Sequence, residues 1–131
     1  DAHWIPPGRP GAGNILVFNN GAGRPEGPFT SVEEIVPPVD KDGNVVSPGD
    51  PIAQTRQVME NLKVIIEEAG GKMEDVAKTT VYVTRLKDRG DIGEVRKEYF
   101  PDAPPANTFL VISSLANPDF LVEIEAIVPL Q

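Results

Sequence analysis

The sequence predicts a single domain of the α+β class. The chain has 131 residues, which is a usual length for one domain and enough to bury a hydrophobic core. β-rich runs occur near both ends, and a helical repeat of apolar residues lies between them. The order read along the chain is strand, variable excursion, helix, strand, helix, strand, strand. We therefore expect a mixed sheet with two helices on one face.

The N-terminal third contains one clear strand and much irregular chain. Residues 1–13 are rich in Pro and Gly and form a lead-in, and residues 14–20 read as the first strand. Residues 21–51 form a Gly/Pro-rich excursion. Within it, residues 31–36 read as a short strand or a helical turn, and residues 36–46 as a hairpin-like segment turning at Asp-Gly.

Two helices follow from capping residues and periodicity. The first begins at Asp50-Pro51, where Asp caps the helix and Pro occupies its first position. It ends at Gly70-Gly71. Its apolar residues recur on one stripe, formed by Val58, Leu62, Ile65, Ile66 and Ala69. The second, shorter helix covers residues 91–100.

The remaining strands cover residues 76–85 and two C-terminal segments joined by a short turn at residues 116–119. In the last segment, alternation places Val122, Ile124, Ala126 and Val128 on one face and Leu121, Glu123, Glu125 and Ile127 on the other. One interpretation is that the face with the two carboxylates sees water. The other is that it lines a pocket or a subunit interface, where an apolar wall raises a carboxyl pKa into the range useful for acid/base chemistry.

Composition excludes several kinds of function. The net charge of −8 opposes binding to nucleic acid. The chain has no cysteine and one histidine, His3, so we expect no disulfide, no metal site and no cofactor. No apolar run is long enough to span a membrane and no signal-peptide pattern is visible, so we expect a cytoplasmic protein.

Two C-terminal motifs resemble a known family. Pro105-Ala-Asn-Thr108 and Val122-Glu-Ile-Glu-Ala-Ile127 resemble the P-A-R-[ST] and I-E-I-E-A-I strands of the reactive-intermediate deaminases (RidA/YjgF). Further blocks at residues 54–62 and 75–83 extend the resemblance over roughly residues 40–128. It implies one chorismate-mutase-like domain over residues 1–131, assembled as a homotrimer around a central barrel, in which neighbouring subunits cover the face that carries Glu123 and Glu125.

The resemblance also implies a chemistry, the hydrolysis of enamines or imines to a carbonyl and ammonia. In the family, a glutamate on the last strand orients or activates water, and an arginine on the preceding strand holds the substrate carboxylate. By position, the glutamate is Glu123, and the arginine is replaced by Asn107. Either another cation compensates, or the substrate lacks an α-carboxylate. Arg96 is a candidate because it lies near a helix position where the family often has an asparagine that reaches the site.

The end of the first strand belongs to the ligand site in the family, and here it contains Asn19, Asn20 and Gly21. Turn formation alone also explains that sequence. We therefore predict a deaminase-type hydrolase for a small enamine or imine, such as an aminomuconate-like ring-cleavage product. Glu123 is the predicted catalytic residue; Asn107, Asn19, Asn20, Gly21 and Arg96 are the predicted substrate contacts. The alternatives are a non-catalytic trimer that binds a metabolite or a protein, and an acid/base enzyme of another reaction type.

Overall fold

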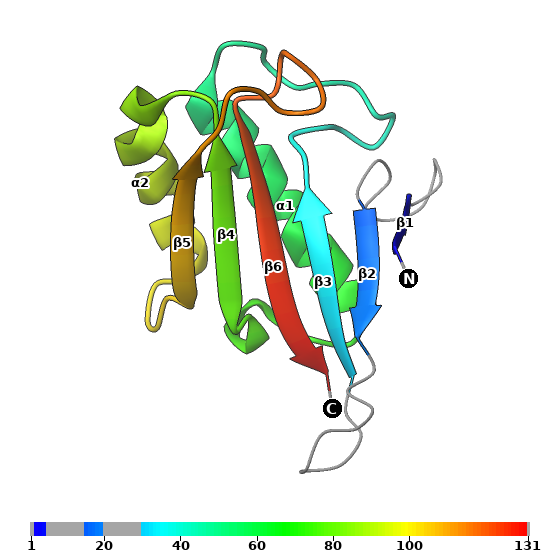
Figure 1. The fold of residues 1–131 in the computed structure, drawn as a ribbon. Helices are drawn as coiled ribbons and strands as arrows, with labels where there is room; N and C mark the ends of the chain where they lie inside the picture. Colours follow the sequence, from blue (N-terminus) through cyan, green and yellow to red (C-terminus); the bar gives the residue numbers. More distant parts are fainter. Residues whose placement is uncertain (1, 5–14, 20–29, 131) are drawn as a thin grey trace.

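The computed structural model describes residues 2–4, 15–19 and 30–130, with side chains from residue 33 onward. The strands are β1 (Ala2–Trp4), β2 (Ile15–Asn19), β3 (Thr30–Val36), β4 (Lys78–Val83), β5 (Ala106–Val111) and β6 (Val122–Leu130). The helices are α1 (Pro51–Glu68) and α2 (Arg89–Tyr99), with short 3-10 helices at Met73–Asp75 and Leu86–Asp88. In the described part of the chain, the strands form one sheet in the order β1-β2-β3-β6-β4-β5 (Figure 1).

Both helices lie on the same side of this sheet, and no helix of the described residues covers the other side, which we call the open face (Figure 1). β5 runs parallel to β4, and the other pairs of neighbouring strands are antiparallel, so the sheet is mixed. The predicted fold class, an α+β domain with two helices on one face of a mixed sheet, is confirmed. The segment at residues 31–36 belongs to strand β3 and is not a helical turn.

The two C-terminal strands are not joined by a short turn alone. The predicted turn exists, with the N–H of Asp119 donating to Asn117 Oδ1 over 2.8 Å, but it lies within a connection from residue 112 to residue 121. β6 inserts between β3 and β4, whereas β5 lies at the sheet edge. The reason is burial: β6 carries a buried residue at every second position from Val122 to Val128, whereas the side chains of β5 are exposed or half-buried.

The ends of α1 are those expected from the sequence. The side chain of Asp50 accepts a hydrogen bond from the N–H of Ala53 over 3.0 Å at the N-terminus. At the C-terminus, Gly70 has φ +90°, a conformation that glycine adopts without a steric penalty, and the N–H of Gly71 donates to the Ile66 carbonyl over 2.9 Å. Ala69, the last residue of the predicted apolar stripe, is exposed because the helix ends there.

The hydrophobic core lies between the helices and the sheet. It contains buried apolar residues of α1, α2 and the helix-facing sides of β3, β4 and β6, among them Val58, Met59, Leu62, Ile92, Val81, Val83, Val122 and Ile124. The predicted hairpin-like segment is also present: Val39 and Val45 form an antiparallel bridge, and Gly43 has φ +86°. Asn61 of α1 fixes it, since Asn61 Nδ2 donates to the Val39 carbonyl over 2.8 Å.

Candidate functional site

Glu123 lies on the open face of the sheet, near the start of β6. Its neighbours Val122 and Ile124 point into the core and are fully buried, so alternation turns Glu123 to the opposite side. The side chain is half-buried, and this burial raises the pKa of its carboxyl group. In the described part of the chain, no lysine or arginine forms an ion pair with Glu123. A carboxyl group in this setting is suited to accept and return a proton.

A phenol group accompanies this carboxyl. Tyr82 of β4 is paired with Glu123 in the strand register, so the two residues are direct neighbours on the same face. Burial raises the pKa of Tyr82, and the Glu125 and Glu123 carboxylates raise it further. Tyr82 therefore remains a protonated hydrogen-bond donor at neutral pH. Sequence reasoning missed Tyr82, although its position opposite the carboxylates follows once the β4–β6 register is known.

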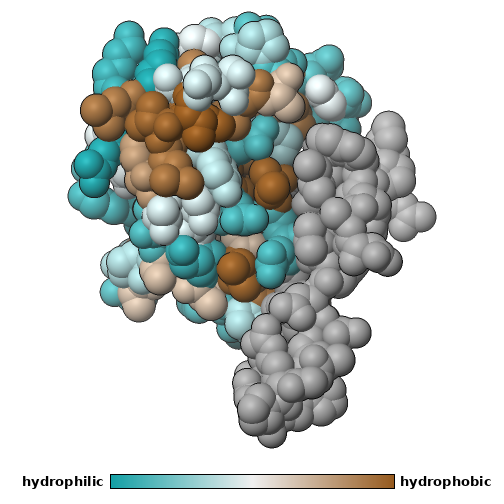
Figure 2. Space-filling view, in the orientation of Figure 1, coloured by the Kyte–Doolittle hydropathy of each residue, from teal (hydrophilic) through white to brown (hydrophobic). Residues whose placement is uncertain are grey.

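The open face is not uniformly polar. Figure 2 views it directly and shows hydrophobic residues gathered where β5 ends, beside a mixture of hydrophilic and hydrophobic residues over the middle of the sheet. The apolar surface of this face includes Leu110, which is 42% exposed and pairs with Tyr82 in the strand register. The half-buried Ile127 lies on the same face as Glu125. Leu110 and Ile127 therefore place apolar surface on the same face as the two carboxylates, among hydrophilic residues.

Asn107 and Arg96, two predicted substrate contacts, meet through a residue that was not predicted. Arg96 Nη2 donates to Thr79 Oγ1 over 2.9 Å, and Thr79 Oγ1 donates to Asn107 Oδ1 over 2.7 Å. α2 supplies Arg96, β4 supplies Thr79, and the edge strand β5 supplies Asn107. Thr79 is fully buried and Asn107 is exposed, so the chain of hydrogen bonds runs from the interior to the surface.

The guanidinium of Arg96 is held in an apolar setting. It lies 5.9 Å from the centre of the Phe100 ring, and burial lowers the pKa of Arg96 from its ordinary value. Its Nε is buried and donates to no atom of the described residues. No described carboxylate forms an ion pair with it. Arg96 therefore brings a positive charge, with no ion-pair partner among the described residues, to the side of Asn107.

The structure does not bring all predicted site residues together within one chain. Thr79 faces the helices and pairs with both Asn107 and Ala126, so the Arg96–Thr79–Asn107 chain lies on the helix side of the sheet. Glu123 faces the opposite side, three residues before Ala126, or about 10 Å along the strand. Of the remaining predicted contacts, Asn20 and Gly21 lie outside the described residues, as does the side chain of Asn19.

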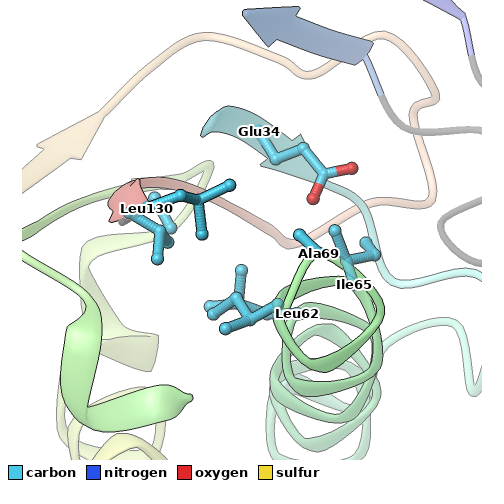
Figure 3. A pocket seen from close by; sticks show the side chains of 8 residues that line it. Glu34, Leu62, Ile65, Ala69 and Leu130 are labelled. Carbon is cyan, nitrogen blue, oxygen red and sulfur yellow. The ribbon is translucent and has the colours of Figure 1, made fainter. Parts of the chain in front are cut away.

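A buried carboxylate on the helix side also escaped the sequence reasoning. Glu34 of β3 is 2% exposed and lines a small pocket with residues of α1 and β6, including Leu62, Ile65, Ala69 and Leu130. Figure 3 shows its carboxylate pointing toward the end of α1. The available signal was its position: Glu34 lies two residues before the buried Val36 and therefore on the same face of β3.

Within the described residues, no three His, Cys, Asp or Glu side chains are arranged to hold a metal ion, and no helix has the length and apolar character needed to span a membrane.

Comparison with known proteins identifies the family. The sequence model described as Endoribonuclease L-PSP matches residues 36–130. The chain belongs to this family. It is the RidA/YjgF family of the sequence resemblance. A RutC family protein of Pyrococcus horikoshii is 38% identical over 121 residues, which cover 86% of this chain and 94% of the relative.

Solved structures of the family have the same fold. The YjgF gene product of Escherichia coli superimposes with a TM-score of 0.68 at 34% identity, covering 75% of this chain and 79% of that protein. E. coli TdcF, solved with bound serine, gives a TM-score of 0.70 at 32% identity and covers 77% and 81%, respectively. The architecture described above is therefore that of the family.

Proposed function

We propose that this member of the family is a hydrolytic deaminase that converts a small enamine or imine to a carbonyl compound and ammonia. The observation that carries the proposal is the state of Glu123, a half-buried carboxyl with a raised pKa and no ion-pair partner among the described residues, beside the protonated Tyr82. General acid/base catalysis requires a group that both accepts and returns a proton near the working pH.

The proposed reaction uses Glu123 twice. As a base, it takes a proton from water while the water oxygen bonds to the imine carbon, and the C=N electron pair becomes a lone pair on nitrogen. The protonated carboxyl then returns the proton to that nitrogen, which gives a carbinolamine with OH and NH2 on one carbon. In a second cycle, Glu123 takes the hydroxyl proton and delivers it to the nitrogen, so the C–N bond breaks, ammonia departs and the carbonyl forms. Tyr82 donates a hydrogen bond on the same face and assists these proton transfers. For an enamine substrate, protonation at carbon to give the iminium precedes the addition of water.

The bound ligand of a relative supports an amino-acid-derived substrate. Serine, which is bound to E. coli TdcF, contains a carboxylate and an amine on one carbon. An imine formed from such a compound retains the carboxylate. In this chain, Asn107 and Arg96 are the candidates to receive that group, since the cation missing from β5 is present on α2.

Assembly is part of the proposal. Within one chain, Glu123 and Asn107 lie on opposite faces of the sheet and cannot hold one small molecule between them. We therefore propose a homotrimer in which Glu123 of one copy meets the Asn107 network of a neighbour. The partly apolar open face, with Leu110 and Ile127 around the carboxylates, fits burial against another subunit.

RNA cleavage is not the function proposed, although the family description contains the word endoribonuclease. The chain has a net charge of −8, and affinity for RNA depends on cationic contacts to phosphate. We propose that its ligand is a small molecule and that it binds neither nucleic acid nor membrane.

The first test measures ammonia release from imines and enamines generated in situ, with and without an α-carboxylate. We expect Glu123→Gln to abolish release above the uncatalysed rate. Glu125→Gln is the matched control, since it makes the same change two residues along the same face and should retain most of the activity. Equal activity in Glu123→Gln and wild type would refute the catalytic role. No release by the wild type from any substrate would favour a non-catalytic trimer that binds a metabolite or a protein.

A subunit-mixing experiment tests the shared site. Glu123→Gln and Asn107→Ala are each expected to be inactive alone. After unfolding and refolding together, random assembly into a ring gives about one site in four with both native residues, if each site takes them from two different copies. Recovery of about a quarter of the activity supports the proposal. No recovery, with mixed trimers confirmed by mass, would place both residues in sites formed by single chains and contradict it.

A further inference from the structure

The hydroxyl group of Thr79 fixes the orientation of the Asn107 amide. Arg96 can only donate, so the bond from its Nη2 uses a lone pair of Thr79 Oγ1. The hydroxyl proton of Thr79 then points to its hydrogen-bond acceptor, the Asn107 oxygen 2.7 Å away. The opposite amide orientation would direct Nδ2 at Thr79 and leave this fully buried hydroxyl proton without that acceptor, which is unfavourable.

This orientation determines what Asn107 offers to a ligand. Its oxygen is occupied by Thr79, so Nδ2 and its two N–H groups are directed away from Thr79 on an exposed residue. No atom of the described residues accepts a hydrogen bond from Nδ2. An asparagine side chain normally offers one acceptor and two donors, but here only the donors remain.

We propose that Arg96, Thr79 and Asn107 form a subsite that accepts only hydrogen-bond acceptors, and among these prefers a carboxylate. Thr79 and Arg96 are positioning residues in this subsite: Thr79 orients the amide, and Arg96 orients Thr79. This inference rests on the proposed function, because it assigns the class of substrate group bound by Asn107. It excludes an amine or ammonium group at that position.

The preference for a carboxylate over a neutral carbonyl follows from the charge of Arg96. Its guanidinium is paired with no described carboxylate and lies in a half-buried, apolar setting, where charges interact more strongly than in water. Each hydrogen bond in the chain also polarises the next, so the positive charge strengthens Asn107 as a donor. The positive charge that an arginine supplies in the family on the strand corresponding to β5 is thus supplied here by Arg96 of α2.

The test uses binding alone, so it does not depend on turnover. The full chain, labelled with ¹⁵N, is titrated with propionate, propionamide and propylammonium while the side-chain amide signal of Asn107 is followed; Asn107→Ala identifies that signal. We expect saturable shifts with propionate, weaker binding of propionamide and no effect of propylammonium. Saturable shifts with propylammonium, or none with propionate, would overturn the inference.

Variants of the positioning residues sharpen the test. Thr79→Val keeps the shape but removes the hydroxyl group, and we expect it to weaken propionate binding about five- to tenfold, while Thr79→Ser restores it. Arg96→Met keeps the apolar stem and should remove the preference for propionate over propionamide. Unfolding midpoints of the variants that equal that of the wild type exclude loss of the fold as the cause of weaker binding. If Thr79→Val binds propionate like the wild type, the positioning role is wrong.

The two proposals fail separately. Propionate binding that follows these variants, without ammonia release from any substrate, leaves the subsite standing and removes the deaminase. Glu123-dependent ammonia release without propionate binding at Asn107 supports the deaminase and refutes the subsite.

Discussion

Gln54 joins the first turn of α1 to the segment that enters β6. We expect Gln54→Leu to reduce stability more than Gln57→Leu, the same change at the other glutamine of α1. Its side chain is 0% exposed. Nε2 donates to the Asp119 carbonyl over 2.9 Å, and Oε1 accepts from the N–H of Leu121 over 2.8 Å. Both bonds connect segments that are more than sixty residues apart in the sequence.

The size of the effect follows from what Gln54→Leu leaves behind. The N–H of Leu121 is buried and loses its partner, which costs about 1–3 kcal/mol. The Asp119 carbonyl is only partly buried and can bond to water instead, so the loss of its hydrogen bond from Gln54 adds about 0.5–1 kcal/mol. Because leucine fills similar space, little cavity cost is added. We expect the free energy of unfolding to fall by about 2–4 kcal/mol.

Urea unfolding followed by circular dichroism at one protein concentration measures this change, and an unaltered m-value shows that the same transition is compared. Gln57→Leu is the control. Gln57 lies one turn further along α1 and is half-buried, and its Nε2 donates only to Asn61 Oδ1, four residues away. Its replacement should change stability by less than about 0.5 kcal/mol. If the two variants lose the same stability, the argument from buried partners is refuted.

Three further predictions concern α1, α2 and β6. Gly70→Ala should destabilise the folded protein by about 1 kcal/mol, because Gly70 has φ +90°. Gly93→Ala in α2, where an added Cβ meets no atom within 4 Å, should stabilise it by about 0.5–1 kcal/mol. Thermal unfolding that shifts in the same direction for both variants would contradict this. Asn61→Ala should cost about 1–2 kcal/mol in urea and increase proteolysis of residues 37–46, because the Val39 carbonyl loses its donor; unchanged cleavage would argue against that anchoring role. Because the pKa of Glu123 is raised in the folded protein, protonation of Glu123 stabilises the folded state; this stabilisation is complete below the ordinary carboxyl pKa and is lost as pH rises through the raised pKa. The stability of Glu123→Gln relative to wild type should therefore increase with pH over that window. A difference in stability that does not change with pH would contradict the raised pKa.

Local features of the fold could be predicted because nearby residues determine them. Asp50, Pro51 and Gly70 define the ends of α1 through capping bonds that span a few residues. The alternation of β6 separates Val122 from Glu123 without reference to any other strand. These predictions hold because their physical cause lies within the sequence window that was read.

Features that depend on distant partners could not be predicted in the same way. The insertion of β6 between β3 and β4 depends on pairing across the whole chain, so a turn after β5 suggested a simpler connection. Thr79 is a polar residue on the same face of β4 as the buried Val81 and Val83. Its role is visible only when α2 and β5 are packed beside β4. The same is true of Gln54, whose partners lie near β6.

Glu123 and Asn107 lie on opposite faces of the sheet, and no change of strand register can bring them to the same face without exposing the core. A shift of β6 by one residue would bring Glu123 to the helix side, but it would also expose Val122, Ile124, Ala126 and Val128, the center of the core. Glu123 can therefore meet Asn107 only through a second copy that approaches the open face. Any subunit that covers this face removes more water from Glu123, which favours its protonated form further. In the proposed function, assembly and the acid/base role of Glu123 would thus be linked by the same burial.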